Sequence, residues 1–153
     1  MNRSILRAGL AALAVVVAAG LVVPAALADG PADIVDKRIK QMKKMRTAMT
    51  GMKQVVAESA LDKAKAEDFS NTVATESKVV VTLFPAGSNV APTEALPAVW
   101  DKPADFKAAA DKATAAADAM LAAAKSGDMG KVKETYEAMR KACDGCHDNF
   151  LKN

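Results

Sequence analysis

The chain has 153 residues and a formal net charge of +3; 25% of its residues are charged and only 4% are aromatic. This length accommodates one ordinary domain. The small net charge gives no argument for nucleic-acid binding, and outside residues 8 to 28 no uncharged run approaches the length that spans a membrane. Because alanine and methionine supply much of the apolar content, the predicted core is thin, and a bulky group is expected to help fill it.

The first 28 residues have the three-part pattern of a secretory signal peptide. Arg3 and Arg7 precede an uncharged run rich in alanine and valine, which ends in Pro24 and the small-residue triplet Ala26-Leu27-Ala28. We expect cleavage after this triplet, so that residues 29 to 153 form an exported domain that is free of the membrane. An uncleaved anchor is the alternative, because the uncharged stretch is just long enough to span a bilayer.

Glycine and proline cluster at a few junctions and divide the rest of the chain into four helical segments without the two-residue alternation of strands. The first helix is predicted to begin at Pro31, and its apolar residues follow the alternating spacing of three and four that is typical of bundle helices. These residues are Val35, Met42, Met45, Met49, Met52 and Val56. Gly51 lies among them and indicates a close approach of another backbone or of a flat ligand.

The second helix is predicted over residues 61 to 83, with Glu76 as an unexplained polar interruption of its apolar face. A long loop follows from Phe84 to Lys102, and connections of this length often have a packing or functional role. The third helix is predicted to begin near Pro103 and to stop at Gly127. A short connection then makes the third and fourth helices antiparallel neighbours. The sequence therefore predicts an all-α fold.

The apolar face of the fourth helix includes both cysteines of the chain. It comprises Val132, Tyr136, Met139, Cys143, Cys146 and Phe150. The segment Cys143-Asp144-Gly145-Cys146-His147 has the C-x-x-C-H pattern of covalent haem attachment. Two thiols one helical turn apart can each form a thioether with a vinyl group on the same porphyrin edge, and His147 can then bind the iron. We therefore predict one covalent haem c per chain.

Other interpretations of this motif remain open. A redox-active dithiol is typical of a βαβ setting, which the pattern of this chain lacks. A structural zinc site needs four ligands, whereas the chain has two cysteines and one histidine. A local disulfide would leave the position of the only histidine unexplained. Once the cysteines bind haem, no hydrolytic or nucleophilic constellation is apparent, so we do not expect an enzyme.

Together with this motif, three segments resemble the class II c-type cytochromes, which are the cytochrome c′ family of bacterial periplasmic proteins. These segments are residues 33–38, 83–88 and 96–100, and the resemblance covers essentially the whole predicted mature chain. It implies an antiparallel four-helix bundle in the periplasm, with the haem between the first and fourth helices. We expect a monomer or homodimer that exchanges electrons with periplasmic redox partners and does not bind nucleic acid.

Members of this family differ in what faces the iron opposite the histidine. High-spin cytochromes c′ leave that position empty behind an apolar side chain and bind gases such as nitric oxide. Low-spin relatives fill it with a methionine of the first helix and carry electrons. Met42 corresponds to that methionine, so we expect a one-electron carrier, closest to the low-spin members, whose haem is ligated by His147 and Met42. A high-spin, gas-binding cytochrome c′ is the alternative.

Arg38 lies on the apolar face of the first helix, four residues before Met42. A guanidinium at this position needs an anion, and a haem propionate would supply one; an arginine directed at water is the alternative. Many family members carry an arginine four residues after the ligating histidine, where this chain has Leu151. The basic residues of the first helix form either a docking surface for an acidic partner or a solvated helix face. They are Lys37, Lys40, Lys43, Lys44, Arg46 and Lys53.

Overall fold

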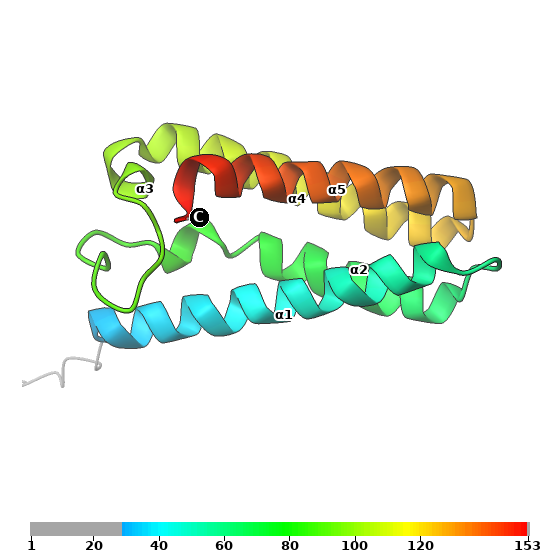
Figure 1. Ribbon diagram of the computed structural model, residues 1–153, viewed down its shortest axis with the longest axis horizontal. Coiled ribbons are helices and arrows are strands. Elements are labelled where there is room, and N and C mark those ends of the chain that lie inside the picture. Colours follow the sequence, from blue (N-terminus) through cyan, green and yellow to red (C-terminus); the bar gives the residue numbers. More distant parts are fainter. Residues whose placement is uncertain (1–28, 153) are drawn as a thin grey trace, which may run out of the picture.

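A computed structural model describes residues 29–152 as an antiparallel bundle of four long helices (Figure 1). These helices are α1 (Pro31–Ala57), α2 (Lys63–Ser77), α4 (Pro103–Ser126) and α5 (Met129–Phe150). A 3₁₀ turn, η1 (Val81–Leu83), and a short helix, α3 (Ala98–Asp101), lie between α2 and α4. Within residues 29–152 there is no strand and no helix long and apolar enough to cross a membrane. The all-α prediction is confirmed, whereas the predicted signal peptide lies outside the described residues.

The helix ends follow the local chemistry of the sequence. Pro31 is the first residue of α1, and the Asp33 carboxylate accepts a hydrogen bond from the Gly30 N–H at 3.1 Å. Gly127 ends α4 with φ 74°, a left-handed conformation that favours glycine. The Asp128 side chain then caps α5 by accepting a hydrogen bond from the Lys131 N–H at 3.0 Å. This tight connection makes α4 and α5 antiparallel, as predicted.

The second helix is shorter than predicted, because α2 ends at Ser77 and only the turn η1 follows. Three successive valines, residues 79–81, lower the helix propensity there, and Pro85 disfavours a helical conformation of the residue before it. The structure explains Glu76, which interrupts the apolar face of the second helix. Its carboxylate pairs with Lys44 at 3.2 Å and its carbonyl accepts a hydrogen bond from the Gln41 amide, so both contacts join α2 to α1.

The core consists largely of alanine and methionine, as the composition predicts, together with valine. Met52, Met120 and Met139 are completely buried. The close approach that Gly51 indicates is made by neither a backbone nor a flat ligand but by the ring of Phe69. A Cβ atom added at Gly51 would lie 2.5 Å from Phe69 Cε2, so glycine allows this ring of α2 to pack against α1.

The four long helices do not pack equally closely. Helix α1 packs against α2, α2 against α4, and α4 against α5, whereas α1 and α5 make far fewer contacts with each other. The beginning of α1 and the end of α5 lie at the same end of the bundle (Figure 1). The α1–α5 side is therefore the least closed side of the bundle.

Arg38 connects α1 to the long loop that precedes α4. Its side chain is only 5% exposed. Nε and Nη2 donate to the Leu83 carbonyl at 3.0 and 2.9 Å, Nη2 donates to Ser88 Oγ at 2.8 Å, and Nη1 donates to Thr93 Oγ1 at 2.9 Å. The guanidinium also lies 4.0 Å from the centroid of the Phe84 ring. The interpretation of Arg38 as an arginine directed at water is therefore wrong.

The same loop is bonded to the end of α5. The Lys152 N–H donates to the Glu94 carbonyl at 2.9 Å, and the Leu96 N–H donates to the Phe150 carbonyl at 2.9 Å. Leu151, which replaces the arginine of many family members, pairs with Ala95 in an isolated bridge. The loop thus holds the beginning of α1 and the end of α5 in one register.

Aromatic rings strengthen this end of the bundle. The ring centroids of Phe84 and Phe106 are 4.8 Å apart, and those of Phe106 and Phe150 are 5.2 Å apart. The Trp100 indole N–H donates to the Pro85 carbonyl at 3.0 Å. These contacts connect the loop to α4 and α5 and give residues 84–102 the packing role that their length predicts.

Replacing Arg38 with methionine is expected to lower the free energy of unfolding by about 2–3 kcal/mol, because several buried oxygen atoms lose their donors. Chemical denaturation of the haem-loaded protein measures this loss. Arg38→Lys should lose less, because it keeps the charge but not the planar set of donors. Arg46→Met, a change at an exposed arginine of the same helix, is the control and should stay within about 0.5 kcal/mol. Equal losses in Arg38→Met and Arg46→Met would contradict the anchoring role.

Candidate haem site

The C-terminal part of α5 carries the three residues of the predicted haem attachment. Cys143 and Cys146 are half-buried and pack against the core, whereas His147 is exposed. Because the two cysteines are three residues apart on a helix, their side chains lie on one face, one turn apart. The structure thus places both attachment sulfurs at the edge of the core.

The chemistry of these sulfurs suits a thioether better than a metal ion. Both thiols are free. Burial, with smaller contributions from Asp144 and Cys146, raises the pKa of the Cys143 thiol to about 11, and burial also raises the pKa of Cys146. Both sulfurs are therefore uncharged at neutral pH when no metal ion is bound. The part of the chain that the structure describes contains no group of three or more His, Cys, Asp or Glu side chains placed to hold a metal ion.

The positions around α5 indicate on which side of this helix the haem is attached. An α-helix turns by about 100° per residue. Ala142, Gly145 and Asn149 all lie on one side of Cys146, where they line a cavity between α4 and α5. Cys143 and His147 lie on the other side of Cys146. Phe150 also lines the cavity, but Cys143 and His147 do not, so the three attachment residues together would hold a haem on the side of α5 that faces α1.

From α1, Met42 and Met49 lie on the side towards α5. The Gln41 side chain reaches α2, where it donates to Glu76. Around the helix axis, Met42 and Met49 lie about 100° and 80° from Gln41, both in the same direction. Because α2 and α5 are the two long helices that neighbour α1, these two half-buried methionines lie on the α5 side.

The loop contacts fix the level of Met42 along the bundle. Arg38 bonds to Thr93, and the adjoining Glu94 bonds to Lys152 just beyond α5, so Arg38 lies near the level of the end of α5. Four residues further along α1, Met42 lies about 6 Å deeper in the bundle. His147 lies a similar distance back along α5. The two predicted axial ligands are thus at similar levels on the two helices, and their bonding to iron stays a prediction.

The predicted contact between Arg38 and a haem propionate also stays a prediction. Four of the five N–H groups of this guanidinium donate to oxygen atoms of the loop, which leaves one on Nη1 for another acceptor. Burial lowers the pKa of the guanidinium, and no carboxylate within residues 29–152 pairs with it. A buried cation without an anion is consistent with a propionate nearby.

The residues that hold Arg38 were missed by sequence reasoning. Leu83 contributes only its carbonyl, so its side chain carries no signal. Ser88 and Thr93 contribute hydroxyl groups from an irregular loop, where no periodic pattern marks a buried residue. The one available signal was the position of Ser88 directly after Gly87, which has φ 79° and makes a turn.

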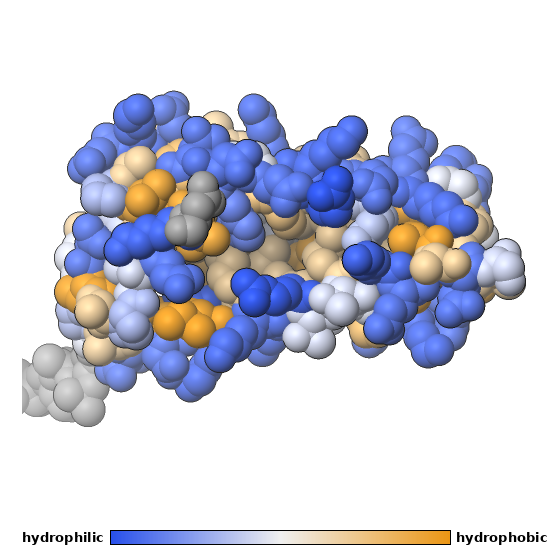
Figure 2. Space-filling model, in the orientation of Figure 1, coloured by the Kyte–Doolittle hydropathy of each residue, from blue (hydrophilic) through white to orange (hydrophobic). Residues whose placement is uncertain are grey.

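The surface between α1 and α5 has room for a flat apolar group. Figure 2 shows a recess with apolar colouring between the charged surfaces of these two helices. Ala113 and Ala116 of α4, which are small and half-buried, pack against the same core. Uncharged thiols, a neighbouring histidine and an apolar recess fit a covalently bound haem. The fold and the site thus define a helical-bundle haem protein of the c type.

Comparisons with known proteins identify the family. The family model described as Cytochrome C' matches residues 33–151. A cytochrome c' of Rubrivivax gelatinosus is 48% identical over 79 residues, which span 51% of this chain and 61% of that relative. A cytochrome c-556 of Agrobacterium fabrum is 31% identical over 117 residues, 76% of this chain and 79% of that relative. The chain belongs to the cytochrome c′ family.

The fold comparison agrees with this result. A solved nitric oxide complex of a variant of cytochrome c prime from Alcaligenes xylosoxidans has a TM-score of 0.75 and 25% identity, and the match covers 80% of this chain and 97% of that chain. Family membership confirms the four-helix bundle and one covalent c-type haem per chain. It does not support the narrower prediction that the chain is closest to the low-spin, methionine-ligated members, because the relative with 48% identity is named cytochrome c'.

Covalent attachment is testable by denaturation in acid acetone, which should leave the haem on the polypeptide. Cys143→Ser combined with Cys146→Ser should abolish this retention, because no thioether can then form. Mass spectrometry of the protein measures one added haem in the unmodified chain and none in the variant. Free thiols at both positions in the mature, haem-loaded protein would contradict the attachment.

Proposed function

We propose that this protein is a monohaem cytochrome c′ that binds small gases at the haem iron, on the face opposite His147. The similarity to a relative named cytochrome c' and to the structure of a nitric oxide complex supports this function. The similarity to the relative named cytochrome c' carries the proposal, and the position of Met42 is compatible with it. The half-buried Met42 thioether lies across the α1–α5 side from the attachment residues, at a level similar to that of His147.

Bound haem supplies an iron that changes between the ferric and ferrous states and that binds a diatomic molecule where a coordination position is open. The residues of this chain determine access to that position. Cys143 and Cys146 hold the group on α5, and His147 is available to bind the iron from the exposed side. Met42 would cover the other face with an uncharged side chain that carries no N–H or O–H donor. Such apolar surroundings favour neutral diatomic gases over anions.

A one-electron carrier ligated by both His147 and Met42 is the second candidate function. The same position of Met42 favours it, since a thioether at the level of the histidine is suited to bind the iron from the opposite face. Methionine ligation would raise the reduction potential and leave no open position for a gas.

Absorption spectra and carbon monoxide binding distinguish the two functions. We expect the unmodified protein to be high-spin in both oxidation states and to bind carbon monoxide when reduced. Met42→Ala should remain high-spin and bind carbon monoxide about tenfold faster, because an obstructing side chain is removed. Met49→Ala, a change of the same side-chain type about two turns further along α1, is the control and should leave the rate within a factor of about two. A low-spin unmodified protein that becomes high-spin in Met42→Ala would instead establish the electron carrier.

We also propose that residues 1–28 are removed on export and that the mature protein acts in the periplasm. The support is the three-part pattern of the first segment, which ends in Ala26-Leu27-Ala28. The intact mass of periplasmic protein should correspond to a chain that begins at Asp29 and carries one haem. Protein recovered with Arg3 still present, in the membrane fraction, would contradict cleavage.

A further inference from the structure

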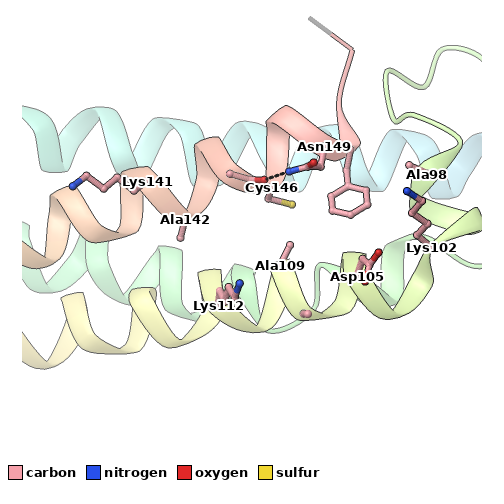
Figure 3. Close-up of a pocket in the computed structure, with 12 residues that line it drawn as sticks. Ala98, Lys102, Asp105, Ala109, Lys112, Lys141, Ala142, Cys146 and Asn149 are labelled. Carbon is pink, nitrogen blue, oxygen red and sulfur yellow. Dashed lines mark hydrogen bonds between the residues drawn. The ribbon is translucent and has the colours of Figure 1, made fainter.

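A cavity of about 580 Å³ opens between α4 and α5 beside Cys146 (Figure 3). Small residues form much of its lining: Ala98, Ala108, Ala109, Ala142 and Gly145. In Figure 3 the Cys146 sulfur points from α5 into the space between the helices, towards Ala109. Because the lining side chains are short, a molecule at this surface comes close to the Cys146 sulfur.

The charged groups around this cavity are mainly basic. Lys102 lies directly before α4, Lys112 lies on α4 and Lys141 lies on α5, whereas Asp105 is the one acidic residue of the lining. All three lysines are exposed, and within residues 29–152 none of them forms an ion pair. The cavity therefore carries an excess of positive charge that this part of the chain does not neutralise.

The haem does not fill this cavity. Of the three attachment residues only Cys146 lines it, and Cys143 and His147 lie on the other side of that residue around α5. A basic rim is also a poor environment for the apolar faces of a porphyrin. The cavity thus adjoins the covalently attached edge of the haem without containing the haem.

We propose that this cavity is the docking site of a redox partner protein, whose acidic surface binds Lys102, Lys112 and Lys141 and which reduces the haem across its Cys146-bound edge. One electron passes from the reduced partner to ferric iron; no bond forms or breaks and no proton moves. The inference rests on haem attachment through Cys146. It holds for both candidate functions, because a gas-binding cytochrome and an electron carrier both need a reductant.

The exposure of the lysines favours a protein surface over a small anion. A single ion pair between exposed side chains contributes little to binding, so one small anion gains little at any of these lysines. Lys102 and Lys112 are ten residues apart, which corresponds to roughly 15 Å along a helix. Several carboxylates spread over a protein surface can match this span and add their weak attractions.

The basic residues of α1, the docking surface considered from the sequence, are less suited to this role. Lys37 pairs with Asp29, Lys40 pairs with Asp36, and Lys44 pairs with Glu76. Half of the six basic residues are thus already paired within the chain. Neither attachment cysteine lies on α1, whereas Cys146 lines the cavity between α4 and α5.

The test measures reduction of the haem by reduced flavodoxin, used as an acidic one-electron donor, at several ionic strengths. Lys102→Glu, Lys112→Glu and Lys141→Glu are combined in one variant. The control combines Lys43→Glu, Lys53→Glu and Lys133→Glu, three exposed lysines that do not line the cavity, so both variants have the same net charge. We expect the cavity variant to react about tenfold more slowly than the control at low salt, and the two rates to converge at high salt.

Equal rates for the two variants at every ionic strength would overturn the proposal. Reduction by dithionite, a small anionic reductant of low charge, should differ between the variants by less than a factor of about two. A tenfold difference with this reagent would show a general anion site and would also overturn docking of a protein. Haem content and reduction potential, measured on each variant, separate these outcomes from a failure of attachment through Cys146.

Discussion

The buried guanidinium of Arg38 is the contact on which the geometry of this protein depends. It binds Leu83, Ser88 and Thr93 of one loop, and that loop is bonded to the residues at the end of α5. The beginning of α1 and the end of α5 are therefore held in register without packing closely against each other. Because of this register, Met42 lies at a level similar to that of His147, as the proposed position of Met42 at the second face of the haem requires.

The sparse contact between α1 and α5 follows from the composition. Alanine supplies much of α4, and the core has few large side chains apart from methionine and the aromatic residues near the loop. Closely packed cores leave few voids, so a thin core of this kind is completed by a bulky group. Covalent attachment places that group at the side where the protein packs least. A basic cavity lies on the other side of α5, between α5 and α4, so the two proposals place gas binding and electron entry on different sides of this helix.

The helical fold and the attachment motif could be predicted from the sequence because both depend on local patterns. A few neighbouring residues are enough to predict the helix start at Pro31, the helix end at Gly127 and the haem attachment at Cys143 and Cys146. The end of α2 was placed too late, because the apolar spacing continues through Val80 and Leu83 although the valine run and Pro85 stop the helix. The partners of Arg38 and of Gly51 could not be predicted, because they come from segments distant in sequence. Whether the iron has a sixth ligand depends on whether the Met42 sulfur bonds to it. The position of the Met42 side chain alone is compatible with both the bonded and the unbonded state.

Iron-edge X-ray absorption of the ferrous, gas-free protein tests the central claim most directly, because it reports the atoms bonded to the iron. From the register that Arg38 fixes and from the cytochrome c′ relatives, we expect the iron to have nitrogen neighbours only, from the porphyrin and His147. The Met42 sulfur should lie close to the iron without bonding to it. A sulfur neighbour at bonding distance, lost in Met42→Ala, would contradict an open gas-binding position and would establish this chain as a methionine-ligated electron carrier.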